Sequence, residues 1–241
     1  MKTTLNVAMV NLIAVLVSLA GCASDHHGAS GGAVTATINK SEQQAMTPDQ
    51  ALARLVEGNR RFAAGESQHH DYIAQAKATA SGQYPFAVVL ACIDSRTAPE
   101  IVFDQGIGDL FVPRVAGNGA FVDMLGSMEY STKVAGAKLV IVMGHTECGA
   151  VKGACDDVRM GNLTAVIEEI RPSVNDVQGV SGEHNSHNKA FVRAATEMHV
   201  RRTVEKIRHD SPIMRELEVS GQIKIVGAMH DISTGQVTFV N

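Results

Sequence analysis

Five side chains in two short segments of the chain could together bind a metal ion and use it for chemistry. Cys92, Asp94 and Arg96 lie within one run of five residues, and His145 and Cys148 follow later in the chain. Two thiolates and one imidazole form a donor set that Zn²⁺ prefers over harder cations. Because three protein ligands leave one coordination position open, this pattern indicates a catalytic zinc site rather than a structural one.

Each of these residues also has a simpler interpretation. Cys92 could be a small apolar filler of the core, and His145 could cap a strand end through a backbone hydrogen bond. Asp94 and Arg96 could form an ordinary ion pair or begin a helix. A single His-x-x-Cys is weak evidence, but its combination with Cys-x-Asp-x-Arg, each following a buried strand, is a specific pattern that favours the metal site.

The segments around these residues predict an α/β fold with a mostly parallel central sheet, flanked by helices and completed by a C-terminal antiparallel hairpin strand. Short apolar runs rich in β-branched residues are typical of strands buried on both faces. A Thr-Pro-x-Gln start and 3.6-residue periodicity indicate helices between them. The predicted strands are 86–91, 110–112, 138–143, 223–229 and 237–240, and the predicted helices are 47–62, 118–133 and 187–210. The periodicity of the first helix predicts one inward face that carries Leu52, Leu55, Val56 and Phe62.

This fold explains how ligands far apart in the sequence could meet. Cys92 directly follows the first predicted strand, and His145 directly follows the third. In open α/β sheets, functional residues gather beyond the carboxyl ends of the strands. We therefore expect neighbouring strands to bring Cys92 and His145 together, with Cys148 facing the same point from the turn into the next helix.

The composition is that of a globular protein without a nucleic-acid footprint. The chain has 241 residues, of which 45% are hydrophobic and 19% charged, and its net charge is −4. A nucleic-acid partner would require a basic patch or stripe, so none is expected. The chain has no Trp and few other aromatic residues, so no platform for stacking bases or sugars is expected.

The first residues predict export and lipid anchoring. Residues 1–22 read as a signal peptide with Lys2 before an uncharged apolar run, ending in a lipobox-like Leu-Ala-Gly-Cys at Cys22. A lipidated Cys22 would be the mature N-terminus and the only attachment to a membrane, in the cell envelope or periplasm. The alternative is a simple secretory peptide cut near Ala20 or Ala23. Residues 23–44 predict a flexible tether before a folded domain over 45–241.

The chain resembles the β-class carbonic anhydrases from about Thr47 to its C-terminus. The resemblance rests on Ala-Cys-Ile-Asp-Ser-Arg at 91–96, on Gly-His-Thr-Glu-Cys-Gly at 144–149, and on Leu-Val-Glu-Gly-Asn-Arg-Arg-Phe at 55–62. Ile93 and Thr97 replace residues that are more usual in the motif. The branch of the family that bicarbonate regulates uses a tryptophan in its effector site, and because this chain has no Trp, that form of regulation is not expected here.

The resemblance implies one Zn²⁺ per subunit, a homodimer or homotetramer, and CO₂ and bicarbonate as substrate and product. It implies a carbonate dehydratase that reversibly hydrates CO₂ to bicarbonate and a proton by zinc-bound hydroxide. Together with the predicted export signal, which most members of the family lack, this activity would serve inorganic-carbon supply or pH homeostasis in the envelope. The residues implied are Cys92, His145 and Cys148 as zinc ligands, Asp94 and Arg96 as a catalytic dyad, and Gln83, Phe111, Tyr130 and Gly149 at the substrate.

Three competing functions follow from the same residues. The protein could be a relative of these enzymes that hydrates CS₂ or a similar linear molecule at the same zinc. A zinc-stabilised binding lipoprotein would hold a fourth protein ligand and would be indifferent to Asp94→Asn. A thiol redox protein using Cys92 and Cys148 ranks last, because no Cys-x-x-Cys is present, and Cys155 reads as a buried filler. Within the enzyme, Asp94 released by Arg96 could also close onto the metal.

Overall fold

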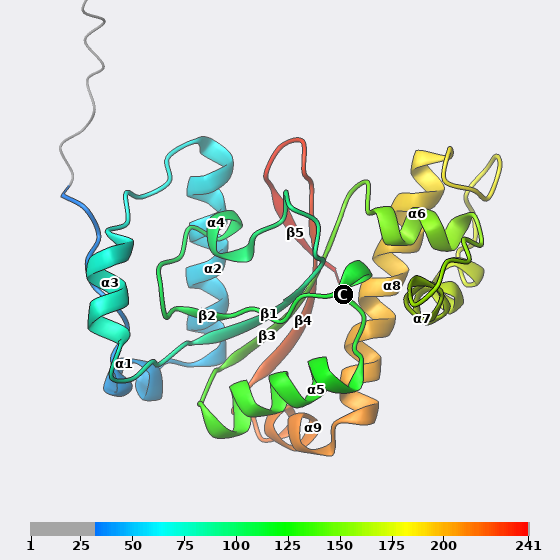
Figure 1. Ribbon diagram of the computed structural model, residues 1–241. Coiled ribbons are helices and arrows are strands. Elements are labelled where there is room, and N and C mark those ends of the chain that lie inside the picture. The colour runs from blue at the N-terminus through cyan, green and yellow to red at the C-terminus, as the bar shows by residue number, and fades with distance from the viewer. Residues whose placement is uncertain (1–31, 241) are drawn as a thin grey trace, which may run out of the picture. The chain divides into compact units, whose positions relative to one another are not determined.

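The computed structural model describes residues 32–240, of which those from Ala33 onward form one compact unit. Its centre is a five-stranded sheet with the strand order β2-β1-β3-β4-β5 (Figure 1). All neighbouring pairs are parallel except β4 and β5, which are antiparallel. The predicted α/β class is therefore confirmed. The strands are β1 (Ala87–Ala91), β2 (Leu110–Phe111), β3 (Leu139–His145), β4 (Lys224–His230) and β5 (Val237–Val240).

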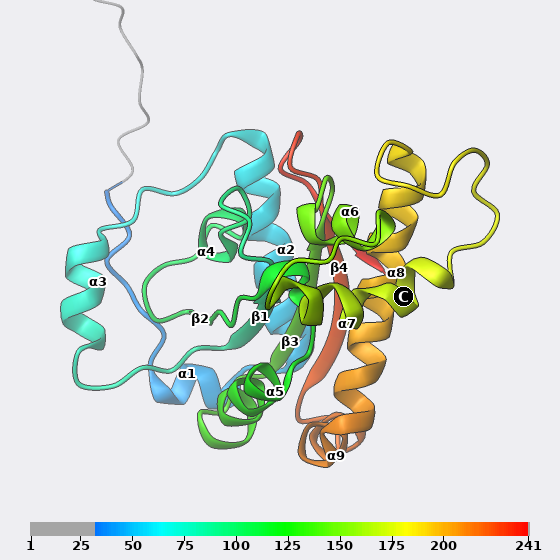
Figure 2. The ribbon, with the colours of Figure 1, turned by 45° about the vertical axis from the view of Figure 1, so that its right-hand side comes forward.

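Helices cover both faces of this sheet. Among residues 32–240, no helix is long and apolar enough to cross a membrane. The helices are α1 (Lys40–Ala45), α2 (Pro48–Ala64), α3 (Tyr72–Thr79), α4 (Pro99–Val102), α5 (Val122–Glu129), α6 (Gly149–Cys155), α7 (Leu163–Asn175), α8 (Lys189–Asp210) and α9 (Pro212–Val219), with a 3₁₀ turn η1 (Ala116–Asn118) and a π-helical turn η2 (Tyr130–Val134). In the turned view, α6 lies at the upper end of the sheet and α9 at the lower end (Figure 2).

Two cores form because successive side chains of a strand point to opposite faces. On β3, Val140 and Val142 face α8 and α9, where Val200 and Leu217 complete one core. The alternate residues of the strand, among them Ile141, face α2 and α4. Every residue of β1 and β3 is buried, as the continuous apolar runs predict.

The helix predicted over 47–62 is present, and its start follows the predicted capping pattern. Thr47 accepts a hydrogen bond from the Gln50 backbone, and the Gln50 side chain accepts one from the Thr47 backbone. Leu55 is fully buried, but Val56, which we expected on the same inward face, is 46% exposed. Val56 lies one position, about 100°, further around the helix than Leu55, which turns it away from the sheet.

Two other segments differ from their predictions. The helix predicted over 118–133 begins only at Val122, because the preceding residues form the turn η1, and it ends in the π-helical turn η2. The strand β2 is half-buried rather than buried, since it pairs with β1 on one side and is an edge strand. The sequence analysis also missed the helices α1, α3, α4, α7 and α9.

The described part of the predicted tether, residues 33–44, contacts the folded domain. Val34 pairs with the backbone of the segment around His70, and Ile38 is buried against the second core. Gln43 is buried in α1 and donates hydrogen bonds to two backbone carbonyls of the domain. Residues 33–44 therefore belong to the folded unit. The predicted signal peptide, Cys22 and the beginning of the tether lie outside the described residues.

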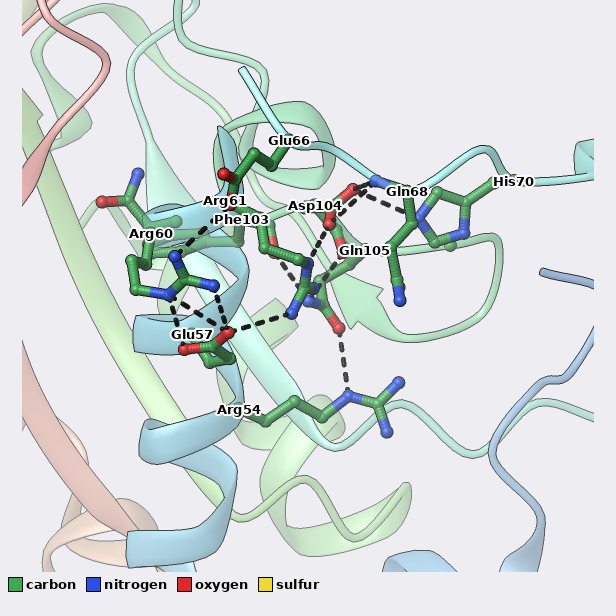
Figure 3. Close-up of polar contacts among 12 residues, drawn as sticks. Arg54, Glu57, Arg60, Arg61, Glu66, Gln68, His70, Phe103, Asp104 and Gln105 are labelled. Atoms are coloured by element: carbon green, nitrogen blue, oxygen red, sulfur yellow. Dashed lines mark hydrogen bonds and ion pairs between the residues drawn. The ribbon is translucent and has the colours of Figure 1, made fainter. Parts of the chain in front are cut away.

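A buried carboxylate ties α2 to the loop that leads into β2. Asp104 accepts a hydrogen bond from Arg61 Nε at 2.5 Å and another from the Gln68 backbone at 3.1 Å. His70 Nε2 lies 3.4 Å from the same carboxylate (Figure 3). Asp104 is 5% exposed, so these donors replace the water that it loses on folding.

Candidate metal centre

The sheet brings the three predicted ligands to one point. Cys92 directly follows β1, and His145 is the last residue of β3, which pairs with β1 in parallel. Glu147 adopts a left-handed conformation with φ = 60°. This reversal turns the chain so that Cys148 becomes the residue preceding α6. Sulfur, nitrogen and sulfur thus approach one another from a strand end, a second strand end and a helix start.

The geometry of these donor atoms fits a tetrahedral zinc site. The ligand atoms of Cys92, His145 and Cys148 all lie within 4.8 Å of one another, and all three residues are buried. The two sulfur atoms are 4.0 Å apart. Zn–S bonds of about 2.3 Å at tetrahedral angles place two sulfur atoms about 3.8 Å apart.

His145 is held in the tautomer that a metal requires. Its Nδ1 lies 2.9 Å from the carbonyl oxygen of Thr146, which can only accept a hydrogen bond. Nδ1 therefore carries the proton, and Nε2 presents a lone pair. Nε2 is buried and has no hydrogen-bond partner among the described residues. A buried nitrogen of this kind requires a partner, and a cation between the two sulfurs would be one.

The two thiols share their charge unequally. The pKa of Cys92 is lowered, first by the hydrogen bond from the Cys148 thiol and also by the backbone N–H of Gly117, which lies 3.4 Å from Cys92 Sγ. The pKa of Cys148 is raised by the same contact and by burial. Cys92 is thus the sulfur that already favours the thiolate form, in which cysteine binds metals.

Asp94 and Arg96 form an oriented pair beside this cluster. Arg96 donates from Nε to Oδ1 at 2.9 Å and from Nη2 to Oδ2 at 2.7 Å. These bonds lower the pKa of Asp94 well below its usual range. Oδ2 lies 4.0 Å from His145 Nε2. An ionised acceptor therefore stands next to the position that the three donors surround.

Sequence analysis missed four residues that support the site. Arg114 donates to the carbonyls of Cys92 at 2.8 Å and Asp94 at 2.6 Å, which holds the backbone of the motif in place. Gly117 supplies the backbone donor to Cys92, and His199 contacts the Gly117 carbonyl from α8. No pattern in the sequence singles out these three.

His230 is the fourth, and a signal for it existed. It ends β4 and stands opposite His145 in the parallel register. Its side chain is buried, and neither ring nitrogen has a hydrogen-bond partner among the described residues. Burial lowers its pKa. The strand-end rule that selected His145 would also have selected His230.

Three predicted substrate residues lie away from the cluster within one chain. Phe111 pairs with Val88 of β1. Val88 lies four residues before Cys92, which corresponds to about 13 Å along a strand. Tyr130 packs edge-on against Phe111 with ring centroids 6.1 Å apart. Gln83 is exposed and precedes β1 at its amino end. Gly149, by contrast, directly follows Cys148 and is exposed.

The strand ends of this α/β sheet thus carry a Cys-His-Cys group that could hold a metal ion and, beside it, an arginine-held aspartate. The family model for carbonic anhydrase matches residues 87–237. Carbonic anhydrase 2 of Mycobacterium tuberculosis is 37% identical over 195 residues, which cover 78% of this chain and 91% of the relative. A carbonic anhydrase of Mycolicibacterium smegmatis is 34% identical over 79% of this chain and 92% of its own length.

A solved structure has the same fold. A β-carbonic anhydrase of Sordaria macrospora, described as tetrameric, superposes with a TM-score of 0.61 at 20% identity, covering 79% of this chain and 96% of that chain. The present chain belongs to the β-class carbonic anhydrase family. It is accordingly an enzyme of the carbonate dehydratase type, as the motifs predict.

Proposed function

We propose that this protein reversibly hydrates CO₂ to bicarbonate and a proton at a zinc ion held by Cys92, His145 and Cys148. The observation that carries the proposal is the ionised Asp94 beside three converging soft donors. When bound there, zinc would act as a Lewis acid that makes water a better nucleophile near neutral pH.

The protein's own residues then have distinct tasks. Within residues 32–240, the cluster holds no fourth Cys, His, Asp or Glu, so one position stays open to water or substrate. Asp94 orients the attacking oxygen by accepting a hydrogen bond from it. Arg96 keeps this carboxylate ionised, so Asp94 accepts a hydrogen bond rather than retaining the proton. The proton released by the reaction therefore leaves to solvent or buffer.

The substitution Asp94→Asn tests the proposal. It preserves the shape of the side chain but removes its charge, so we expect full zinc content and a fall in CO₂ hydration of about 100-fold or more. Metal analysis and stopped-flow hydration measure the two quantities. Asp176→Asn is the control, because Asp176 also pairs with an arginine, Arg202, away from the cluster.

The outcomes separate the competing functions. Stoichiometric zinc without hydration in the wild type would favour the binding lipoprotein. Turnover of CS₂ without turnover of CO₂ would favour the alternative substrate. Equal activity of Asp94→Asn and wild type would show that the carboxylate has no part in the reaction.

We further propose that the protein is a homodimer or a dimer of such dimers. Val122, Tyr130 and Val134 are 79%, 54% and 70% exposed and lie on one side of the molecule, with Phe111 next to Tyr130. An apolar face of this kind is typical of an interface between subunits. If Gln83, Phe111 and Tyr130 line a CO₂ pocket, their distance from the cluster means that they line it in another subunit.

Export and lipidation at Cys22 form the last part of the proposed function. The support is the apolar run ending in Leu-Ala-Gly-Cys at residues 19–22. In this proposal the enzyme works in the cell envelope, supplying inorganic carbon or buffering pH.

A further inference from the structure

A chain of hydrogen bonds reaches Cys92 from the packed helices α7 and α8. Gly117 N–H donates to Cys92 Sγ at 3.4 Å. The carbonyl oxygen of Gly117 lies 2.8 Å from His199 Nε2, and His199 Nδ1 lies 3.1 Å from Ser173 Oγ. Ser173 is in α7 and His199 in α8, and both are buried, with exposures of 1% and 2%. Neither residue touches the metal ligands.

The donors and acceptors in this chain can be assigned without ambiguity. A carbonyl oxygen only accepts, so His199 Nε2 carries a proton and donates it to Gly117. His199 Nδ1 therefore holds a lone pair and accepts from the Ser173 hydroxyl. Burial lowers the pKa of His199 to about 4, so the ring is neutral near neutral pH. Ser173 therefore donates to His199, and His199 donates to the carbonyl of Gly117. The N–H on the other side of the Gly117 Cα donates to the sulfur.

Gly117 is held tightly by the residues around it. Gly117 has φ = 74°, a region that favours glycine. A Cβ at this position would lie 2.5 Å from Ile170 Cδ1 and 3.3 Å from Ala150 Cβ. The loop is therefore pressed between α6, α7 and the cluster. The contact from His199 fixes the Gly117 carbonyl and thereby restricts how the N–H on the other side of the Cα can turn.

We propose that Ser173 and His199 are a positioning pair that fixes the orientation of Gly117, and that the N–H of Gly117 in turn sets the position and electron density of the Cys92 sulfur. The N–H and the carbonyl of Gly117 belong to the two planar peptide units that meet at its Cα, so holding the carbonyl restricts the rotation that would turn the N–H away from the sulfur. Partners outside the ligand shell commonly tune a metal in this way. The inference rests on the proposed metal at Cys92, His145 and Cys148.

Two matched sets of variants test the pair. His199→Gln retains an N–H donor at a similar reach, whereas His199→Met has similar length and no donor. Ser173→Ala removes the hydroxyl that orients the ring. Its control is Ser131→Ala, the same change at a serine that is 2% exposed and bonds only within its own helical segment. Thermal unfolding of each variant reports whether the fold persists.

The first measurement is the thiolate-to-metal charge-transfer band of the cobalt-substituted protein. The second is the rate at which a chelator removes zinc. We expect His199→Met to shift the band to longer wavelength and to lose zinc about tenfold faster or more. We expect His199→Gln to remain close to wild type, Ser173→Ala to change in the direction of His199→Met, and Ser131→Ala to be unchanged. A role in folding alone would lower the unfolding temperature without this pattern.

The results also distinguish this inference from the proposed function. Folded His199→Met with the wild-type band and zinc-loss rate would overturn the positioning role while an active wild type upholds the enzyme. If His199→Met does not fold, Ser173→Ala against Ser131→Ala decides, and identical spectra overturn the pair. A wild type that loads metal but hydrates nothing would refute the proposed function and leave the spectral test intact. A wild type that binds neither metal overturns both.

Discussion

Asp94 lies two residues after Cys92, and this spacing places an ionised acceptor beside the Cys-His-Cys cluster. Besides the two side-chain bonds, the backbone N–H of Arg96 donates to Asp94 Oδ1 at 3.0 Å. Arg114 fastens the carbonyls of Cys92 and Asp94 from the neighbouring segment. The short spacing within the turn therefore orients Asp94. Arg114, in the segment that follows β2, keeps the backbone of the motif rigid.

His199 gives a residue-scale prediction about acid stability. Its pKa is depressed to about 4 when folded, from a usual 6.5, so the unfolded chain binds the extra proton. The free energy of unfolding should therefore fall between pH 7 and pH 5, and His199 should account for about 2 kcal/mol of that fall. Arg202 of the same helix also lowers the pKa of His199. Glu169 of α7 lines the same surface hollow as His199 and Arg202.

Urea unfolding of zinc-saturated wild type and His199→Gln at both pH values checks this prediction. The variant should lose about 2 kcal/mol less than wild type on acidification, because glutamine does not titrate. Parallel losses in the two proteins would mean that His199 is already protonated, or equally neutral, in both states.

At the scale of elements, α2 is secured by one buried carboxylate and one partly buried arginine. Arg61 Nε bonds Asp104, and the Arg61 side chain is 20% exposed. The adjacent Arg60 faces solvent, is 59% exposed and pairs with Glu57. Two neighbouring arginines thus make ion pairs of opposite burial, which Figure 3 shows together.

Replacing each arginine by methionine separates the two cases. Arg61→Met leaves the buried Asp104 without its guanidinium and should lower the free energy of unfolding by about 2–4 kcal/mol. Arg60→Met should have a much smaller effect, since exposed pairs are screened by water. Urea denaturation of both variants provides the comparison. Equal effects would show that the Asp104 contact does not stabilise α2.

At the scale of the whole molecule, the exposed apolar face beside β2 predicts how subunits meet. Val122→Asp places a charge on that face and should reduce the mass measured by sedimentation to that of a smaller species. Val219→Asp is the control, because Val219 is 84% exposed on α9, outside this face. The mass of Val122→Asp should fall and that of Val219→Asp should not. An unchanged mass in Val122→Asp would place the interface elsewhere.

The proposed lipid anchor at Cys22 predicts where the molecule is found in cells. Cells expressing the full chain should incorporate labelled palmitate into the wild type and hold it in the membrane fraction, and Cys22→Ser should do neither. Cys155→Ser is a control for loss of a cysteine elsewhere. Membrane retention of Cys22→Ser without label would instead indicate an uncleaved apolar segment.

Much of the fold follows from local signals in the sequence. The capping pattern of Thr47 and Gln50 marks the start of α2, and the apolar runs before Cys92 and His145 mark β1 and β3. Parallel pairing of those strands then brings two ligands together, so the Cys-His-Cys cluster was predictable. The Val56 side chain was misplaced because periodicity gives a face only to within about one residue.

Other features depend on contacts between distant segments, which no local pattern encodes. His199 and Gly117 are 82 residues apart, and their hydrogen bond exists only because α8 packs behind η1. The separation of Phe111 and Tyr130 from the cluster likewise follows from the register of β2 on β1. The sequence by itself determined which residues could hold a metal, because donor chemistry and strand ends are local. Only the tertiary structure decided which peptide and which helices hold those donors in place, because packing joins residues that the chain keeps apart.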